Sequence, residues 1–137
     1  MARDPAPLPM PLESGLFDLL KMEAVLLTRD RVVIRMPVDK RVHQPYGLLH
    51  GGATLALAET AASVGTVFHL DPAREVAVGM EINANHLRPK RDGVITATAT
   101  PLHSGRTTVV WDVRVTDEDD RLVAISRCTV AKISRRA

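Results

Sequence analysis

The chain has few of the residues that build disulfides, metal centres or nucleic-acid surfaces. Its 137 residues include one cysteine, Cys128, so no disulfide can form within the chain, which fits a reducing compartment. The five histidines show no metal-ligand spacing, and a single cysteine cannot complete a zinc site. One Trp, one Tyr and two Phe offer few rings to stack on bases, and the 18 Lys and Arg form no basic run. We therefore expect no metal site and no nucleic-acid partner.

The sequence also lacks a predicted membrane span. Its longest apolar segment, residues 51–70, contains Glu59 and His69, whereas a spanning helix needs about 20 predominantly apolar residues. Residues 1–12 contain four prolines but not the basic start and apolar stretch of a secretory signal. We expect a loose proline-rich arm over residues 1–12, a single domain over residues 13–137, and a soluble, cytoplasmic protein.

One long apolar segment is surrounded by strand-like sequence. From Gly52 to Phe68 there is no proline, and apolar residues cover every side of a helix, which predicts a buried helix. Leucine spacing predicts a short helix over residues 13–22. Strand composition is found in six segments: residues 24–27, 31–38, 75–87, 94–102, 106–116 and 122–133. Strands grouped after a helix favour an α+β antiparallel sheet, and a helix buried all round needs a curved sheet, a second subunit, or both.

The candidate chemistry lies at the start of this buried helix and midway along it. Gly51 and Gly52 expose backbone N–H groups where a helix carries partial positive charge, which suits a developing oxyanion, although such a dipeptide also suits a tight turn. Glu59 lies among alanines and leucines with no Lys or Arg within a helical turn. Such a carboxylate either faces a groove or has a raised pKa, and both suit a general base or nucleophile. The alternative is a Glu that caps the backbone of a partner chain.

Helix geometry limits how these groups can act together. His50 and Glu59 are nine positions apart, which is about 13.5 Å along a helix. A reacting carbonyl must lie within about 3 Å of its oxyanion donor and of its attacking group. If Gly51 and Glu59 act on one carbonyl, they must therefore come from antiparallel helices of two subunits. This predicts an active site across a dimer interface, with two sites per dimer.

Several polar residues around these groups are weaker candidates. Ser63 is one turn beyond Glu59 and can bond the carboxylate or a water, or can simply permit close helix packing. Gln44 can donate to a carbonyl oxygen, or can be an ordinary solvated loop residue. The segments 85–91 and 103–107 suit phosphates and a nucleotide, or are ordinary solvated turns. The sequence has no Gly-x-Ser-x-Gly elbow, and Cys128 is expected to be inert core.

Taken together, the motifs resemble the hotdog-fold acyl-CoA thioesterases, the family of the 4-hydroxybenzoyl-CoA and phenylacetate-degradation thioesterases. The resemblance rests on Gln44-Pro45, on Gly47 to Ala53 and on Leu57-Ala58-Glu59. It continues in four further segments: residues 79–86, 101–105, 110–111 and 126–127. It covers about residues 31–133 and is closest to the 1,4-dihydroxy-2-naphthoyl-CoA hydrolases of menaquinone synthesis. The phenylacetate-type enzymes have Asp in place of Glu59, which moves this chain toward the hydroxybenzoyl and naphthoyl side.

The resemblance implies a five-stranded antiparallel sheet around the central helix, and dimers that pair into tetramers. It implies that Glu59 is the nucleophile or general base, that the Gly51 N–H polarises the thioester carbonyl, and that Gln44, His50 and Ser63 assist. It implies further substrate and coenzyme A contacts, at Gly79, His86, Leu87, Arg88, Pro89, His103, Ser104, Gly105, Arg106, Thr107 and Thr108. No metal or redox cofactor is expected, because coenzyme A is part of the substrate.

The expected activity is hydrolysis of an aromatic or medium-chain acyl-CoA to the free acid and CoA. One alternative is an acyl-CoA hydratase or dehydratase that uses His50 and Glu59 to move protons on the acyl chain. Another is an acyl-CoA-binding module without turnover, because a fold does not fix a function. The acyl group itself stays open, since a hydrophobic pocket discriminates weakly between similar apolar groups.

Overall fold

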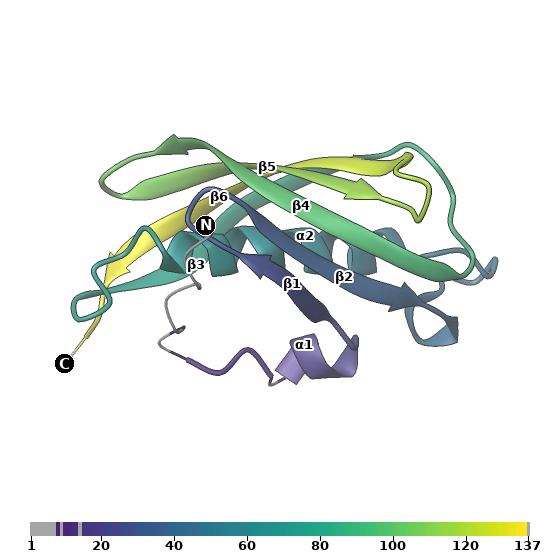
Figure 1. Cartoon of the computed structure of the whole chain (residues 1–137), viewed down its shortest axis with the longest axis horizontal. Helices are drawn as coiled ribbons and strands as arrows, with labels where there is room; N and C mark the ends of the chain where they lie inside the picture. The colour runs from purple at the N-terminus through teal and green to yellow at the C-terminus, as the bar shows by residue number, and fades with distance from the viewer. Residues whose placement is uncertain (1–7, 9, 14, 137) are drawn as a thin grey trace.

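A computed structural model describes residues 8, 10–13 and 15–136, and in it a twisted sheet curves over one long helix (Figure 1). The elements in chain order are α1 (Gly15–Leu19), β1 (Glu23–Leu27), β2 (Val32–Val38), the 3-10 helix η1 (Lys40–Val42), α2 (Gly51–Val67), β3 (Glu75–His86), β4 (Gly93–Ser104), β5 (Thr108–Thr116) and β6 (Leu122–Ser134). Within the described ranges, no helix combines the length and the apolar character that a membrane crossing requires.

The strands form one antiparallel sheet in the order β1-β2-β4-β5-β6-β3. The expected α+β hotdog architecture is confirmed. The strand number differs, because the described residues form six strands rather than the five that the resemblance implies. The additional strand is β1, whose residues pair with β2 in a hairpin. Strand β3 lies at one edge of the sheet, next to α2.

Helix α2 begins at Gly51, one residue earlier than predicted, and is most deeply buried on the side that faces the sheet. Leu57, Ala58 and Ala61 on that side are fully buried. On the other side, Ala56 and Glu59 keep part of their surface accessible. The sheet of a single chain therefore covers only part of a helix that the sequence predicts to be buried all round, and the remaining face is available to a second subunit.

Trp111 anchors the sheet to the second half of α2. Its ring is fully buried, and its Nε1–H donates to Thr66 Oγ1 at 2.8 Å. The ring lies so close to Gly65 that a Cβ atom built there would be 2.5 Å from a ring carbon. A glycine, which weakens an isolated helix, is thus required here by close packing.

The N-terminal segment lies on the side of α2 away from the sheet (Figure 1). The helix predicted over residues 13–22 is shorter in the structure, where α1 spans Gly15–Leu19, and it cannot continue through Lys21 because that residue has a φ of 51°. The predicted loose arm falls mostly outside the described residues. Two of its described residues, Leu8 and Leu12, are partly buried and pack against the core.

A buried histidine fastens the far end of α2 to two neighbouring loops. One ring nitrogen of His69 bonds the carbonyl oxygen of Arg29 at 2.8 Å, and the other bonds Ser104 Oγ at 2.7 Å. The carbonyl can only accept, so His69 Nε2 carries the proton and Nδ1 accepts from the serine hydroxyl. Burial lowers the pKa of His69 below its ordinary value. The folded state therefore favours the neutral form of the His69 imidazole.

The lowered pKa of His69 predicts that the free energy of unfolding decreases in mild acid. Because its folded pKa is lowered, the unfolded chain binds more protons, and stability falls as pH drops below about 6.5. We expect His69→Leu to destabilise the protein by about 1–3 kcal/mol at pH 8, since it leaves the Arg29 carbonyl and Ser104 hydroxyl unpaired. Between pH 7.5 and 5, the stability of the variant should also decline less than the stability of the wild-type protein. Urea unfolding of both proteins at both pH values measures these changes.

The carboxylates with lowered pKa values do not obscure this test. Glu23 and Glu118, for example, lose their stabilising charge only as pH falls below about 4.5, because their ordinary pKa is near that value. An unchanged decline between pH 7.5 and 5 in His69→Leu would contradict the assignment.

Candidate active site

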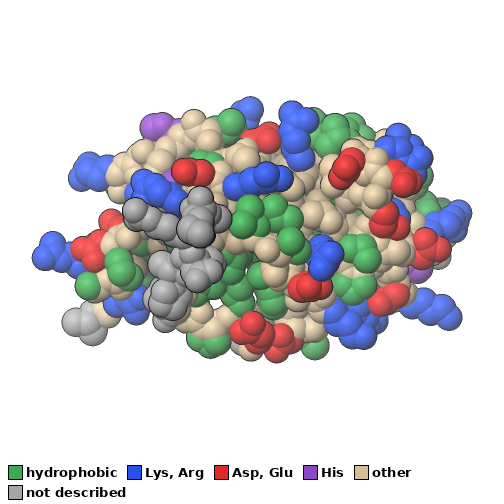
Figure 2. Space-filling view, viewed as in Figure 1, with side chains coloured by type: hydrophobic (Ala, Val, Ile, Leu, Met, Phe, Trp, Pro, Cys, Tyr) green, Lys and Arg blue, Asp and Glu red, His purple; other side chains and the backbone are tan. Residues whose placement is uncertain are grey.

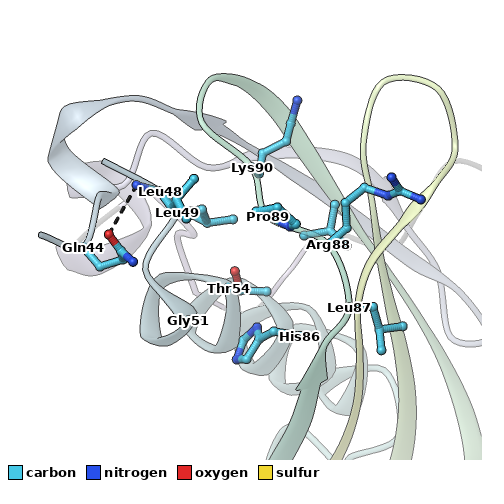
Figure 3. A pocket seen from close by; sticks show the side chains of 11 residues that line it. Gln44, Leu48, Leu49, Gly51, Thr54, His86, Leu87, Arg88, Pro89 and Lys90 are labelled. Atoms are coloured by element: carbon cyan, nitrogen blue, oxygen red, sulfur yellow. Dashed lines mark hydrogen bonds between the residues drawn. The ribbon is translucent and has the colours of Figure 1, made fainter. Parts of the chain in front are cut away.

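The loop before α2 is held by the side chain of Gln44. Its Oε1 accepts hydrogen bonds from the backbone N–H groups of Tyr46 at 2.5 Å and Leu48 at 3.4 Å. The turn passes through Gly47, whose φ of 79° favours glycine. Because Oε1 is occupied by two donors, the Gln44 amide nitrogen is left to donate elsewhere. It points toward the Gly51 end of α2 (Figure 3).

The same loop is tied to the segment between β3 and β4. The backbone N–H of Leu49 donates to the carbonyl oxygen of Lys90 at 2.7 Å, and His43 Nε2 bonds the carbonyl oxygen of Arg91 at 2.6 Å. These bonds bring Gln44 and the predicted binding segment 86–89 to opposite walls of one hollow.

His50 caps the helix and thereby fixes the first helical turn. Its Nδ1 accepts from the Gly52 N–H at 2.8 Å, so its proton is on Nε2. The N–H of Gly51 is different, because no acceptor for it is found among the described residues. A free N–H at the positive end of a long helix is a donor for an anion or for a polarised carbonyl oxygen.

Gly51 lies at the base of a hollow of about 350 Å³, here called the amide hollow. His86 forms part of its wall, and its imidazole approaches so closely that a Cβ on Gly51 would be 2.8 Å from Nε2 (Figure 3). A side chain at this position would therefore force the imidazole or the start of the helix to move. The amide hollow brings together six predicted site residues: Gln44, Gly51, His86, Leu87, Arg88 and Pro89.

Two cationic side chains border the amide hollow, and they differ in exposure and in ion pairing. Lys90 Nζ lies 2.5 Å from a carboxylate oxygen of Glu118, and its side chain is largely buried. The hydrogen bond from this ammonium holds the pKa of Glu118 below its ordinary range. Arg88 is exposed at the rim (Figure 3). Its guanidinium suits bidentate binding of a phosphate group.

Glu59 lies elsewhere, on the uncovered face of α2. Together with Ser63 it lines a second hollow of about 350 Å³, here called the carboxylate hollow. Among the described residues, no hydrogen-bond or ion-pair partner of Glu59 is found. The structure thus places this acid on a groove, which is one of the two environments that its sequence context allows.

Strand β3 makes room for the carboxylate at Gly79. A Cβ atom built on this glycine would overlap Oε1 of Glu59. Gly79 therefore lies against the candidate catalytic group, as its predicted place in the site requires. Its function within one chain is to leave space for the acid.

A single chain does not bring Gly51 and Glu59 together. They are eight positions apart, or about 12 Å along the helix axis. The residues that line the amide hollow and the carboxylate hollow form two separate sets. One carbonyl cannot touch both groups of the same chain.

The predicted contacts at residues 103–108 lie at the opposite end of α2 from Gly51. They comprise the end of β4, the connection to β5 and the first residue of β5, and Ser104 bonds His69, which follows the C-terminal end of the helix. A helix of 17 residues is about 25 Å long, so this loop does not share a hollow with Gly51 in one chain. Its Ser104 hydroxyl has a structural partner. Substrate contact by this loop stays a prediction that requires another subunit.

The sequence patterns missed several lining residues. The amide hollow also includes Leu48, Leu49, Thr54 and Val123, and the carboxylate hollow includes Leu16, Ala56, Thr60 and Val64. Most of these are small or apolar and look like ordinary core residues. Lys90 also lines the amide hollow, and it belongs to segment 85–91, which the sequence suggests as a phosphate-binding segment.

Cys128 takes no part in this chemistry. It is buried in β6, as predicted, and burial raises the pKa of its thiol to about 12, with a smaller effect of the Glu59 carboxylate. In the part of the chain that the structure describes, no cluster of three His, Cys, Asp or Glu side chains is arranged to hold a metal ion. The expected absence of a metal stays a prediction.

Comparison with known proteins identifies the family of the chain. The family model described as "Thioesterase superfamily" matches residues 46–124, which is more than half of the chain. A protein named putative esterase ComA2 from Bacillus subtilis is 48% identical over 126 residues, covering 92% of this chain and 100% of the relative. A 1,4-dihydroxy-2-naphthoyl-CoA hydrolase from Listeria monocytogenes is 44% identical over 122 residues, covering 89% and 98%.

A solved structure agrees with these sequence matches. A mutant of the thioesterase PA1618 from Pseudomonas aeruginosa is 41% identical and superposes with a TM-score of 0.86, covering 90% of this chain and 88% of that chain. The chain belongs to the thioesterase superfamily of hotdog-fold proteins and is a thioester hydrolase.

Proposed function

We propose that the chain hydrolyses the thioester of an acyl-CoA at two sites built across a homodimer. Each site combines the Gly51 N–H of one subunit with the Glu59 carboxylate of the other. The observation that carries the proposal is the separation of these groups in one chain, with the N–H lacking an acceptor among the described residues and the acid on the uncovered face of α2. The site is incomplete without a second copy.

Two-fold symmetry sets where the helices must cross. In a two-fold interface, if a residue of one subunit contacts a second residue in the partner, the same two residues also contact each other with the subunits exchanged. Gly51 and the partner's Glu59 can then meet only if antiparallel α2 helices cross near Leu55 and Ala56, midway between them. Ala56 lies on the uncovered face, where its small side chain permits close helix approach. Pairs of such dimers would form the tetramer that the family resemblance implies.

The chemistry follows from the donors and the acid. The thioester carbonyl oxygen accepts from the Gly51 N–H and from the Gln44 amide, while His50 fixes the helix start. Glu59 attacks the carbonyl carbon, or takes a proton from a water that attacks it, and Ser63 supports that group. The C–S bond breaks, and the CoA thiolate leaves and takes up a proton. If Glu59 attacks directly, a water molecule then hydrolyses the resulting anhydride, so that both routes release the free acid and regenerate the carboxylate. Arg88 at the rim binds a phosphate of the leaving CoA.

The Listeria relative, named as a 1,4-dihydroxy-2-naphthoyl-CoA hydrolase, supports an aromatic acyl group for this chain too. Hydroxybenzoyl, phenylacetyl and medium-chain aliphatic groups are the other candidates. A role in menaquinone synthesis or phenylacetate degradation, and a cytoplasmic location, belong to the same proposal. A panel of these acyl-CoAs, with CoA release followed by a thiol reagent, ranks them. The Cys128 thiol does not interfere at pH 8, because its pKa is about 12.

Mixing two inactive variants tests the shared site. We expect Glu59→Gln and Gly51→Ala to be nearly inactive alone and to recover activity when refolded together. Each mixed dimer has one site in which both groups are intact, so about a quarter of wild-type activity is expected if half of the dimers are mixed. No recovery in demonstrably mixed dimers would contradict a site that combines Gly51 and Glu59 from two subunits. A separate assay tests the alternative hydratase activity, because a hydratase would add water to crotonyl-CoA without releasing thiol.

A further inference from the structure

A third hollow adjoins the candidate site, and the N-terminal segment forms one of its walls. This arm hollow has a volume of about 120 Å³. Leu8, Met10 and Leu12 line it on one side, opposite residues of α2 and β3 that include Val67 and Ala77. Among the described residues that line it, none carries a charge and Ser63 is the one polar residue. Such a lining suits an apolar group.

The arm hollow neighbours the carboxylate hollow. Ser63 and Val64 line both, one turn of α2 beyond Glu59. Val67, deeper in the arm hollow, is eight positions from Glu59 and therefore about 12 Å farther along the helix. An acyl group whose carbonyl lies beside Glu59 must therefore extend beyond a first ring to enter the arm hollow.

The size of the arm hollow limits what it can hold. An apolar engineered cavity of about 150 Å³ holds one benzene molecule, so a hollow of 120 Å³ is of the right scale for one ring or for the end of an alkyl chain. The wall made by the arm is anchored, since Leu8 and Leu12 are partly buried against the core. Met10 is 48% exposed, so its side chain has room to change. The face of the molecule that carries this segment has apolar side chains beside it and mixed charges around it (Figure 2).

We propose that Leu8, Met10 and Leu12 select the acyl group by enclosing its distal part. The preferred substrates would be acyl-CoAs with a second ring or a comparably long apolar tail. Acyl groups that end beside Glu59, short of Ser63, would leave the arm hollow unused. This inference rests on the proposed thioesterase function, and it gives the N-terminal segment a role in substrate choice.

Two full-length variants test the proposal through a ratio of substrates. The measured quantity is kcat/KM for 2-naphthoyl-CoA divided by kcat/KM for acetyl-CoA. Met10→Trp should fill the arm hollow, and Leu12→Ala should remove one wall. Either change should lower the ratio about tenfold, mainly through KM for the larger substrate, which is the usual scale for losing a snug apolar contact. Leu19→Ala is the matched control, because Leu19 is 70% exposed on α1 and should leave the ratio unchanged.

The outcomes separate the two proposals. A wild-type ratio in both Met10→Trp and Leu12→Ala, or an equal loss on both substrates, would overturn the selecting role and leave thioester hydrolysis standing. Absence of thiol release from every acyl-CoA by the wild-type protein would instead overturn the proposed function. Thermal unfolding of each variant shows whether it folds, and Met10→Trp, at a half-exposed position, keeps the test available if Leu12→Ala does not.

Discussion

Replacing Glu59 by glutamine is expected to lower kcat by about 10²–10⁴-fold, the usual contribution of a positioned acid–base group. Glutamine keeps the size of the side chain and therefore still fits against Gly79, but it can neither attack the carbonyl nor take a proton from water. The affinity for acyl-CoA should change little, because the carboxylate acts on the reacting carbon and Arg88 is placed to bind the CoA. Steady-state thiol release and acyl-CoA binding to the variant measure the two effects separately.

A matched substitution shows whether the loss is specific to this acid. Glu23→Gln removes an exposed carboxylate that pairs with Arg35 on the outer strands, away from both hollows. It should keep wild-type kcat. If Glu59→Gln also keeps near wild-type turnover, then Glu59 is not the catalytic acid, and the dimer model loses its second reacting group.

Placing a methyl group on Gly51 is expected to lower kcat by about 10²–10³-fold, the effect of losing one oxyanion donor. The N–H itself remains in Gly51→Ala, but the added Cβ would lie 2.8 Å from His86 Nε2, so the helix start or the imidazole must move. A displaced N–H no longer points at the carbonyl oxygen. The fold should persist, because alanine is a better helix former than glycine.

The contact with His86 provides the control for this prediction. If the loss in Gly51→Ala comes from the clash, removing the ring in the double variant Gly51→Ala/His86→Ala should restore part of kcat relative to Gly51→Ala. Measuring kcat of both single variants and of the double variant gives the coupling between the two positions. Additive losses would mean that His86 does not set the position of the Gly51 N–H.

Hydrophobic periodicity was sufficient for most of the fold. The absence of proline from Gly52 to Phe68 located α2 to within a residue at each end, and strand composition over residues 106–116 located β5. Strand β1 was recognisable as a short apolar segment, yet the family resemblance implied five strands. The length of α1 was not predictable, because its end depends on the positive φ of Lys21, which leucine spacing does not reveal.

The candidate site was predictable where chemistry conflicted with the surrounding sequence. A carboxylate within an alanine-rich helix and two glycines at its start are unexpected in an ordinary core, and the structure places Glu59 and Gly51 on hollows. The apolar walls were not predictable, because Leu48 or Val64 is no different in composition from a core residue. The arm hollow was not predictable from the sequence either, because it depends on how Leu8 and Leu12 pack against the rest of the chain.

The space at Gly79 links the helix and the edge strand in a way that constrains both sequences. Oε1 of Glu59 occupies the place where a side chain of β3 would begin, so the reach of the acid and the size of residue 79 are complementary. A shorter acid on the helix would withdraw from the strand and release this position from its requirement for glycine. Whether a hotdog enzyme uses Glu or Asp on this helix should therefore correlate with which residue it has at the Gly79 position of the neighbouring strand.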